Sequence, residues 1–186
     1  MTDHWRPTRA QLEAAYGTTI RDVIADGLDV LFCGINPGLY SGAVGHHFAR
    51  PGNRFWPALH RSGFTPVQLS PFDERDLLGL GLGITNLVAR TTATAAELTS
   101  PELLSGGRKL AAKVRRRRPG HLAVLGVTAY RAAFEKKSAD VGPQDHEIGG
   151  TKVWVLPNTS GLNAHYQLPA LVREFRKLRR VSGAGP

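Results

Sequence analysis

Residues 29–38 read DVLFCGINPG, an apolar run that passes directly into a turn containing two glycines. The run over 29–33 has the length and the branched and aromatic side chains of a buried β-strand. Three later runs have the same character. They lie at residues 82–87, 122–125 and 152–156.

Four helical patterns lie among these strands. Asn53 is suited to cap a helix over residues 55–63, and Pro101 is suited to the first turn of a helix that continues through Val114. Further helices are expected over 128–136 and 168–180, the latter with one apolar face. Strands that alternate with helices predict the α/β class, a three-layer α/β/α sandwich around a mostly parallel central sheet.

The composition is typical of a globular chain. Its 186 residues, 41% hydrophobic and 21% charged, suffice for one domain with a substantial core but not comfortably for two. We therefore expect a single domain over residues 1–186, with a core over about 28–180 and residues 1–16 as an N-terminal extension. No apolar run approaches the roughly 20 residues that span a bilayer. The polar N-terminus lacks the apolar stretch of a signal peptide, which favours a cytoplasmic location.

The single cysteine, Cys33, excludes an internal disulfide, a cysteine-rich zinc site and a four-cysteine iron–sulfur cluster. Because Cys33 lies in an apolar run, we interpret it as a small buried hydrophobic residue. The formal net charge of +9 favours a polyanionic partner, with nucleic acid the first candidate. A solvated basic surface is the alternative.

Two clusters concentrate the positive charge. Residues 115–118 are four consecutive arginines at the end of an expected helix, where cations complement the helix dipole. The second cluster crowds the last helix and either faces phosphate or is simply exposed. It contains Arg173, Arg176, Lys177, Arg179 and Arg180.

The loops after the strands are the first place to look for a ligand site, because ligands of open α/β sheets bind beyond the carboxyl ends of the strands. The first strand is followed by a glycine-rich loop over residues 34–48, and the last by PNTSGLN at 157–163. Glycines let the backbone approach a ligand closely. Neither loop is a Walker loop or a dinucleotide fingerprint, because the required Gly-Lys-Ser/Thr and G-x-G-x-x-G patterns are missing.

These loops resemble those of the mismatch-specific uracil-DNA glycosylases, relatives of thymine-DNA glycosylase within the uracil-DNA glycosylase superfamily. The first matching motif is GINPG at 34–38 followed by FARPGNRFW at 48–56. Three more matches follow in order: GITNLV at 83–88, GGRKL at 106–110 and WVLPNTSGL at 154–162. A lone Asn-Pro-Gly is also an ordinary turn. The matches together span roughly residues 28–180, so the resemblance implies the uracil-DNA glycosylase fold.

The resemblance implies a base-binding pocket with one catalytic residue. Asn36 would hold the attacking water, which an amide can orient through its carbonyl oxygen but hardly deprotonate. Phe48 would stack on a base flipped out of DNA, although a core position is the alternative for this aromatic ring. Ile35, Ser41 and Asn86 would line the same pocket, with Ser41 near the 5-position of the base.

The last loop would enter the DNA minor groove. Leu162, between Gly161 and Asn163, would occupy the place of the flipped base, since inserted apolar side chains are a recurring way to unstack a base step. A turn leucine packed into the core is the alternative. Asn158 and Ser160 either grip a phosphate or shape the turn, and His165 is expected near backbone phosphate.

Some positions depart from the family pattern. Thr159 stands where proline is usual, so this loop is expected to be somewhat less rigid. Asn86 varies among relatives, some of which carry lysine, and it either contacts the base or a second water or caps the strand end. His46 and His47 are interpreted as loop or phosphate-side residues. The histidine spacing indicates no metal site, and no cofactor is expected.

The resemblance predicts a monofunctional enzyme that flips uracil, notably from G·U mismatches, and hydrolyses its N-glycosidic bond to start base excision repair. No lysine lies in the motif loops to serve as a Schiff-base nucleophile. The expected partner is double-stranded DNA with uracil or a related damaged base, and the protein is expected to be monomeric. The alternatives are a hydrolase of free nucleosides and a non-catalytic module that binds damaged DNA.

Overall fold

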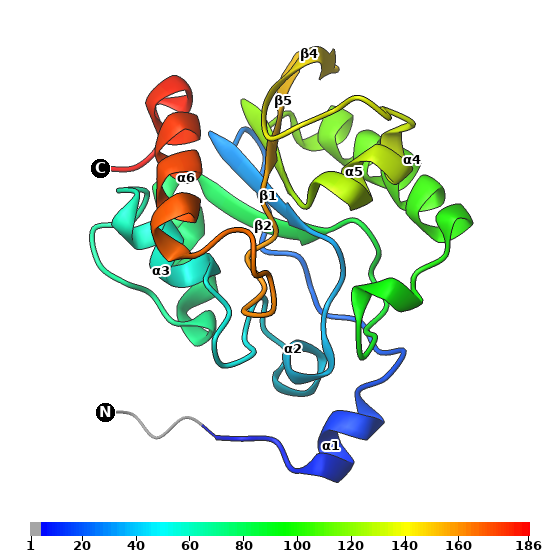
Figure 1. Ribbon diagram of the computed structural model, residues 1–186. Coiled ribbons are helices and arrows are strands. Elements are labelled where there is room, and N and C mark those ends of the chain that lie inside the picture. The colour runs from blue at the N-terminus through cyan, green and yellow to red at the C-terminus, as the bar shows by residue number, and fades with distance from the viewer. Residues whose placement is uncertain (1–4) are drawn as a thin grey trace.

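The computed structural model describes residues 5–186 and has a five-stranded sheet at its centre (Figure 1). The strand order is β2-β1-β3-β5-β4. All neighbouring strands are parallel except β4 and β5, which pair antiparallel. The strands are β1 (Val30–Gly34), β2 (Leu82–Asn86), β3 (His121–Leu125), β4 (Gly142–Ile148) and β5 (Thr151–Leu156).

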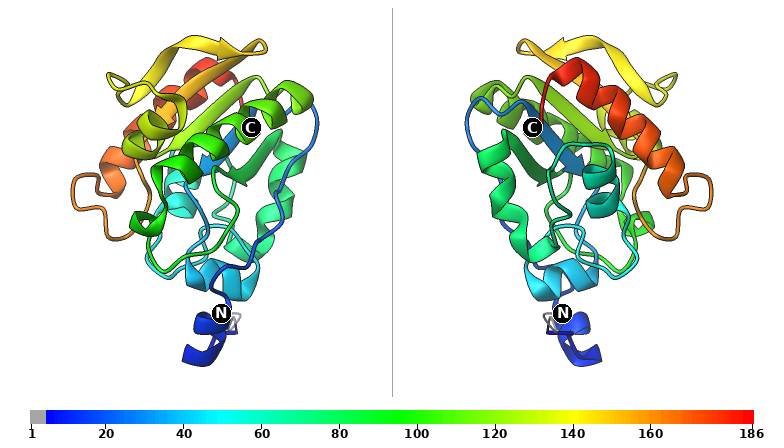
Figure 2. Two further views of the ribbon diagram at one scale, coloured as in Figure 1. Left: turned by 90° about the vertical axis from the view of Figure 1, so that its right-hand side faces the viewer. Right: turned by 90° about the vertical axis from the view of Figure 1, so that its left-hand side faces the viewer.

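Helices cover both faces of this sheet. On one face lie α3 (Phe55–Arg61) and α6 (Leu168–Ser182), and on the other lie α4 (Ser100–Arg117) and α5 (Val127–Phe134) (Figure 2). The alternation of β1 explains the two faces, because Val30 and Phe32 join the cluster that contains α3 and α6, whereas Leu31 and Cys33 join the other. The predicted three-layer α/β/α fold is confirmed.

The predicted helices form where their signals lie. The Oδ1 of Asn53 accepts a hydrogen bond from the backbone N–H of Phe55 at 2.9 Å, at the start of α3. Pro101 occupies the first turn of α4, after a capping box between Thr99 and Glu102. The apolar face of α6 is buried, with Phe175 fully enclosed. Local capping and periodicity therefore set these helices.

The sequence did not reveal β4. Only its two end residues, Gly142 and Ile148, are buried, and the residues between them are polar and at least partly exposed. A strand at the sheet edge buries little of either face, so it carries no hydrophobic alternation. A short helix, α2 (Leu39–Val44), was also not predicted; it lies inside the glycine-rich loop. A 3₁₀ helix, η1 (Pro71–Leu80), precedes β2.

The N-terminal part of the chain begins with α1 (Arg9–Ala14), which lies next to α2 at one edge of the molecule (Figure 1). Residues 1–4 of the expected extension lie outside the described residues. Ala15 and Val23 are buried, and Val23 forms an isolated antiparallel bridge with Ile84 of β2. Within residues 5–186, no helix is both long and apolar enough to cross a membrane.

Candidate active site

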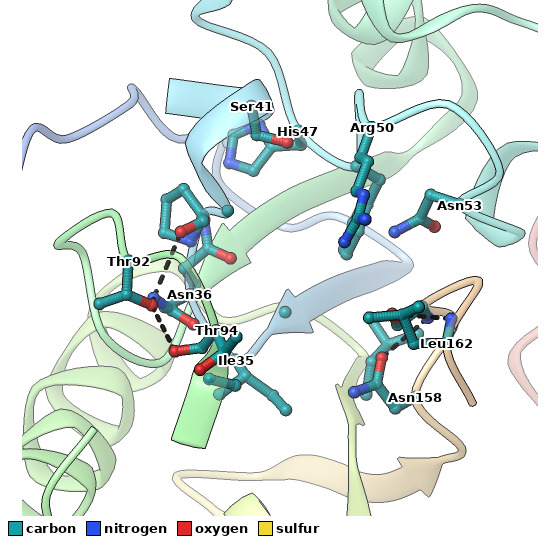
Figure 3. Close-up of a pocket in the computed structure, with 18 of the residues that line it drawn as sticks. Ile35, Asn36, Ser41, His47, Arg50, Asn53, Thr92, Thr94, Asn158 and Leu162 are labelled. Carbon is teal, nitrogen blue, oxygen red and sulfur yellow. Dashed lines mark hydrogen bonds between the residues drawn. The ribbon is translucent and has the colours of Figure 1, made fainter. Parts of the chain in front are cut away.

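A cavity of about 200 Å³ opens where the parallel strands end at their carboxyl edge. Asn36 and Thr92 lie on one side of it, and Asn158 and Leu162 lie on the opposite side (Figure 3). The cavity brings together eight residues that the sequence indicated from four separate segments. They are Ile35, Asn36, Ser41, Phe48, Asn86, Asn158, Ser160 and Leu162.

The side-chain amide of Asn36 is held by its nitrogen. Its Nδ2 donates to the backbone carbonyls of Pro37 at 3.2 Å and Arg90 at 3.0 Å, and to the Oγ1 of Thr92 at 2.7 Å. Two of these partners are carbonyls, which only accept, so they define which end of the amide carries the nitrogen. The Oδ1 atom makes no hydrogen bond to any residue within 5–186, and is therefore available to accept a hydrogen bond from a ligand.

The loop after β2 supports this amide. The Oγ1 of Thr92 donates to the carbonyl of Thr94 at 2.8 Å, so its lone pairs face Asn36. The side chain of Arg90 binds both carboxylate oxygens of Glu102 in α4, at 2.6 and 3.2 Å. The hydrogen bond from Arg90 lowers the pKa of Glu102 to about 2. This ion pair ties the loop to a long helix and keeps the Arg90 carbonyl near Asn36.

Phe48 forms an aromatic wall of the cavity. Its ring stacks on Phe55 with centroids 4.1 Å apart and planes 24° apart, and its backbone has an unusual positive φ of 52°. The ring is partly buried: it packs against the core cluster and also lines the cavity, and its stacking on a flipped base stays a prediction.

Asn86 reaches the same space from the end of β2. A Cβ placed on Gly34 would lie 2.6 Å from the Oδ1 of Asn86 and 3.2 Å from the Phe48 ring. Glycine at position 34 therefore lets the side chains of Asn86 and Phe48 approach the carboxyl end of β1 closely. The side chain of Asn86 makes no hydrogen bond within residues 5–186, so no strand-capping bond is observed.

His47 is a loop residue, as one of its two interpretations held, and it is buried against the cavity. Its exposed fraction is 1%, and its Nδ1 lies 2.9 Å from the Oε2 of Glu74 in η1. The backbone N–H of His47 donates to the same oxygen at 2.8 Å. The Nε2 of His47 has no partner among the described residues.

Glu74 also binds His46, whose Nδ1 lies 3.0 Å from the Oε1 of the carboxylate. Burial raises the pKa of Glu74, but the hydrogen bonds from His47 and His46 outweigh it and leave the pKa below its ordinary value. The carboxylate thus anchors the loop between α2 and Phe48. The Oγ of Ser41 supports the same loop by accepting a hydrogen bond from the backbone of Ala49 at 3.1 Å.

Leu162 lies on a tight loop after β5 and is 74% exposed, so it is not a core residue. The loop closes on itself: the Oδ1 of Asn158 accepts from the backbone of Ser160 at 2.9 Å, and the Oγ of Ser160 accepts from the backbone of Leu162 at 3.3 Å. Asn163 donates to the Asn158 carbonyl at 2.9 Å. Asn158 and Ser160 therefore do shape the turn, as one of their two interpretations held.

Arg54 fastens this loop to α3. Its Nη1 donates to the carbonyls of Asn163 at 2.9 Å and Tyr166 at 3.0 Å, and its Nη2 donates to that of Gly161 at 3.1 Å. A Cβ on Gly161 would lie 2.7 Å from the carbonyl of Gly52, so only glycine permits this close approach. The guanidinium fork thus fixes the base of the loop while its tip, Leu162, stays in solvent.

Asn163 and His165 lie outside the cavity that contains Asn36. They line a neighbouring hollow between this loop and the start of α5, together with Thr128 and Tyr166. The backbone N–H of His165 donates to the Oδ1 of Asn163 at 3.1 Å, and its side chain is exposed. The two hollows share four lining residues, Ile35, Asn158, Ser160 and Leu162.

Four functional residues escaped the sequence reasoning: Thr92, Arg54, Glu74 and Ile20. Arg54 lies inside the quoted motif at 48–56, so the motif itself was a signal for it. Thr92 and Glu74 act through partners 56 and 27 residues away in the chain, and Ile20, which lines the cavity, precedes every motif. No local pattern marks such positions.

The cavity lining holds no lysine among the described residues. Across residues 5–186, no group of three or more histidine, cysteine, aspartate or glutamate side chains is arranged to hold a metal ion. The polar groups that line the cavity are amides, hydroxyls, a histidine and Arg50, and they lie among apolar side chains such as Ile35, Leu125 and the Phe48 ring. They can bind a flat polar ring and position a water molecule.

Fold and site together define an α/β protein with a small pocket, lined by apolar side chains and a few polar groups and walled by one aromatic ring, at the carboxyl edge of its sheet. The family model described as the Uracil DNA glycosylase superfamily matches residues 22–179. The chain belongs to the uracil-DNA glycosylase superfamily. It is therefore a glycosylase of this general type, and its partner is DNA.

Proposed function

We propose that this protein is a monofunctional glycosylase of the mismatch-specific type, which flips uracil out of duplex DNA and hydrolyses its N-glycosidic bond. The observation that carries the proposal is the held amide of Asn36. Its nitrogen donates to three acceptors, which leaves the oxygen to accept a hydrogen bond from water.

The proposed reaction needs no strong base. Uracil leaves as an anion, and the sugar becomes an oxocarbenium ion that a positioned water can attack. Asn36 would orient that water through Oδ1, since an amide does not deprotonate water at neutral pH. Holding the water in line with the sugar lowers the entropic part of the barrier.

Phe48 and Asn86 would bind the leaving base. The Phe48 ring offers a stacking surface, and its backbone N–H makes no hydrogen bond within residues 5–186, unlike those of His47 and Ala49 on either side. A preorganised N–H donor beside a leaving anion stabilises the charge that develops. Asn86 has both a donor and an acceptor, which suits the mixed hydrogen-bonding edge of uracil.

The loop of Leu162 would hold the duplex open. An exposed leucine on a loop braced by Arg54 matches the use of an apolar wedge that fills the place of a flipped base. The net charge of +9 is consistent with a polyanionic partner. Monomeric state, cytoplasmic location and action on G·U mismatches in base excision repair stay predictions.

The decisive experiment uses labelled oligonucleotides with uracil in G·U, A·U and single-stranded form, followed by alkali to reveal abasic sites. We expect base release without strand cleavage before alkali, and near-complete loss of release in Asn36→Ala with binding to abasic-site DNA kept. Release from free deoxyuridine but not from DNA would indicate a nucleoside hydrolase. Binding without release would indicate a damage-binding module.

A further inference from the structure

The segment between α1 and the bridge at Val23 lies against the loop that supports Asn36. The backbone N–H of Gly17 donates to the carbonyl of Thr91 at 2.9 Å, and the N–H of Thr91 donates to the carbonyl of Thr18 at 2.8 Å. Both backbone groups of Thr91 are thus occupied by residues from the N-terminal part of the chain.

These backbone groups belong to two peptide groups, 90–91 and 91–92, and the other end of each peptide group binds Asn36 or Pro37. The peptide that contributes the Thr91 N–H also contributes the Arg90 carbonyl, which accepts from the Nδ2 of Asn36 at 3.0 Å. The peptide that contributes the Thr91 carbonyl also contributes the Thr92 N–H, which donates to Pro37 at 3.1 Å. Each peptide plane therefore joins the N-terminal segment on one side to Asn36 or Pro37 on the other.

Further contacts hold this segment in place. The hydroxyl of Tyr16 donates to Glu97 of the short 3₁₀ helix η2 (Ala95–Glu97) at 3.0 Å, and the Oγ1 of Thr18 donates to the carbonyl of Ala15 at 2.6 Å. Ile20 continues from it into the cavity wall. The segment is therefore packed between the loop after β2 and the site.

We propose that residues 16–20 are a positioning element of the active site, which sets the orientation of the Asn36 amide through the two peptide groups around Thr91. This inference rests on the proposed function for its catalytic consequence. Its structural part, that the segment orders the amide, holds independently of the reaction. Hydrogen bonds to a peptide polarise its other end. Losing the bond to Thr18 weakens the Arg90 carbonyl as an acceptor of Asn36, and losing the bond from Gly17 weakens the Thr92 N–H that holds Pro37.

A pair of matched glycine variants separates positioning from general stability. Gly17 has φ of +75° and Gly27 has φ of +65°, and an added Cβ would meet nothing within 4 Å at either place. The Cβ of a substituted residue therefore adds backbone strain at either position without a contact of its own. Gly27 donates to the carbonyl of Arg117, in the turn before β1 and away from the carboxyl edge of the sheet, so Gly27→Val serves as the control.

We expect both variants to lower the unfolding temperature by similar amounts. Only Gly17→Val should slow single-turnover release of uracil, by about tenfold or more, because small displacements of a positioning group are costly. The affinity for abasic-site DNA should stay within about twofold, since neither glycine offers a side chain to DNA. Equal rates in the two variants, after correction for the folded fraction, would overturn the proposal.

The side-chain amide of Asn36 provides a readout without catalysis. In ¹⁵N-labelled protein its Nδ2 proton signals, assigned by their absence in Asn36→Asp, should exchange slowly with solvent in the full chain and in Gly27→Val. They should exchange faster in Gly17→Val. Unchanged exchange in Gly17→Val would refute the positioning role, whatever the rate of uracil release. Faster exchange would support it even if the wild type released no uracil.

If Gly17→Val does not fold, Tyr16→Phe tests the same element more gently by removing the hydroxyl that donates to Glu97. Tyr40→Phe in α2 is the control, because the hydroxyl of Tyr40 makes no hydrogen bond within residues 5–186. We expect about a threefold slower single turnover and faster amide exchange for Tyr16→Phe alone. Identical behaviour of the two tyrosine variants would contradict the proposal.

Discussion

The Nδ2 of Asn36 lies 2.7 Å from the Oγ1 of Thr92, and the Thr92 hydroxyl donates its own hydrogen bond to the carbonyl of Thr94. The two residues are 56 positions apart in the chain and come together because β1 and β2 are parallel neighbours whose loops leave the same edge. With the bonds to Pro37 and Arg90, this contact restricts rotation of the Asn36 amide and so defines the direction in which its Oδ1 points. The proposed chemistry depends on that orientation.

Replacement of Thr92 by valine keeps the shape of this buried side chain and removes the acceptor. We expect single-turnover release of uracil to fall about 10- to 100-fold, because the amide regains a second orientation. Thr65→Val is the matched control, since the Thr65 side chain is also buried, its Oγ1 has no partner among the described residues, and it does not line the cavity. Equal losses in the two variants would point to packing rather than to the amide.

The wedge predicts a dependence on base pairing. Leu162→Ala should slow release from duplex DNA about tenfold, most for A·U and less for G·U, because unstacking costs least for mismatched or unpaired bases. Release from single-stranded uracil should change little. Val181 is also an exposed apolar residue but lies on α6, so Val181→Ala should leave the release rates from A·U, G·U and single-stranded uracil unchanged. A uniform loss on all substrates would count against a wedge.

Arg54 should influence the duplex reaction through the loop. Arg54→Lys replaces a planar fork that reaches several carbonyls by a single ammonium group, so the loop loses its brace. We expect the same ranking of substrates as for Leu162→Ala, together with faster proteolysis of the loop. Arg61→Lys, on the exposed end of α3, is the control. A stability loss without a change in substrate ranking would restrict Arg54 to folding.

Glu74 predicts a pH-dependent contribution to stability. Its pKa lies below the ordinary value of 4.5 in the folded protein, because its hydrogen bonds with His47 and His46 outweigh the effect of burial. A depressed carboxyl pKa stabilises the fold above about pH 4.5, and this contribution is lost as the pH falls through the folded value.

Glu74→Gln should therefore lower the free energy of unfolding by about 1–3 kcal/mol near pH 7, where the carboxylate accepts from both imidazoles and the backbone of His47. The difference from wild type should shrink in acid, as measured by denaturant unfolding across this range. Glu147→Gln, exposed on β4, should show no such pH dependence. A constant difference at all pH values would mean that Glu74 acts by shape alone.

Asn86 is expected to govern the context in which uracil is accepted. With both a donor and an acceptor it can contact the base directly, so recognition would depend less on a weak opposing pair. Asn86→Lys should narrow release toward G·U, with A·U and single-stranded uracil falling most. Equal changes across the three substrates would show that Asn86 does not set the context.

The sequence by itself determined the layers and the edge that bears the site. The apolar run before Gly34 and the helix patterns follow from periodicities of two and 3.6 residues, which are local properties of the chain. The position of Asn36 directly after β1 follows as well, because parallel strands end at one edge. The starts of α3 and α4 depend on near neighbours in the chain: Asn53 bonds the backbone of Phe55 two residues later, although Arg54 is the N-cap residue, and Pro101 lies in the first turn of α4 as predicted.

The tertiary structure alone decided which distant residues hold the site residues in place. The polar edge strand β4 buries almost nothing and so leaves no hydrophobic pattern. Arg54 reaches carbonyls more than 100 positions later in the chain, and Gly17 and Thr18 reach Thr91 through backbone groups that every residue type shares. Hydrogen bonds between distant backbone groups are set by how the elements pack, so they cannot be predicted from the identity of the side chains.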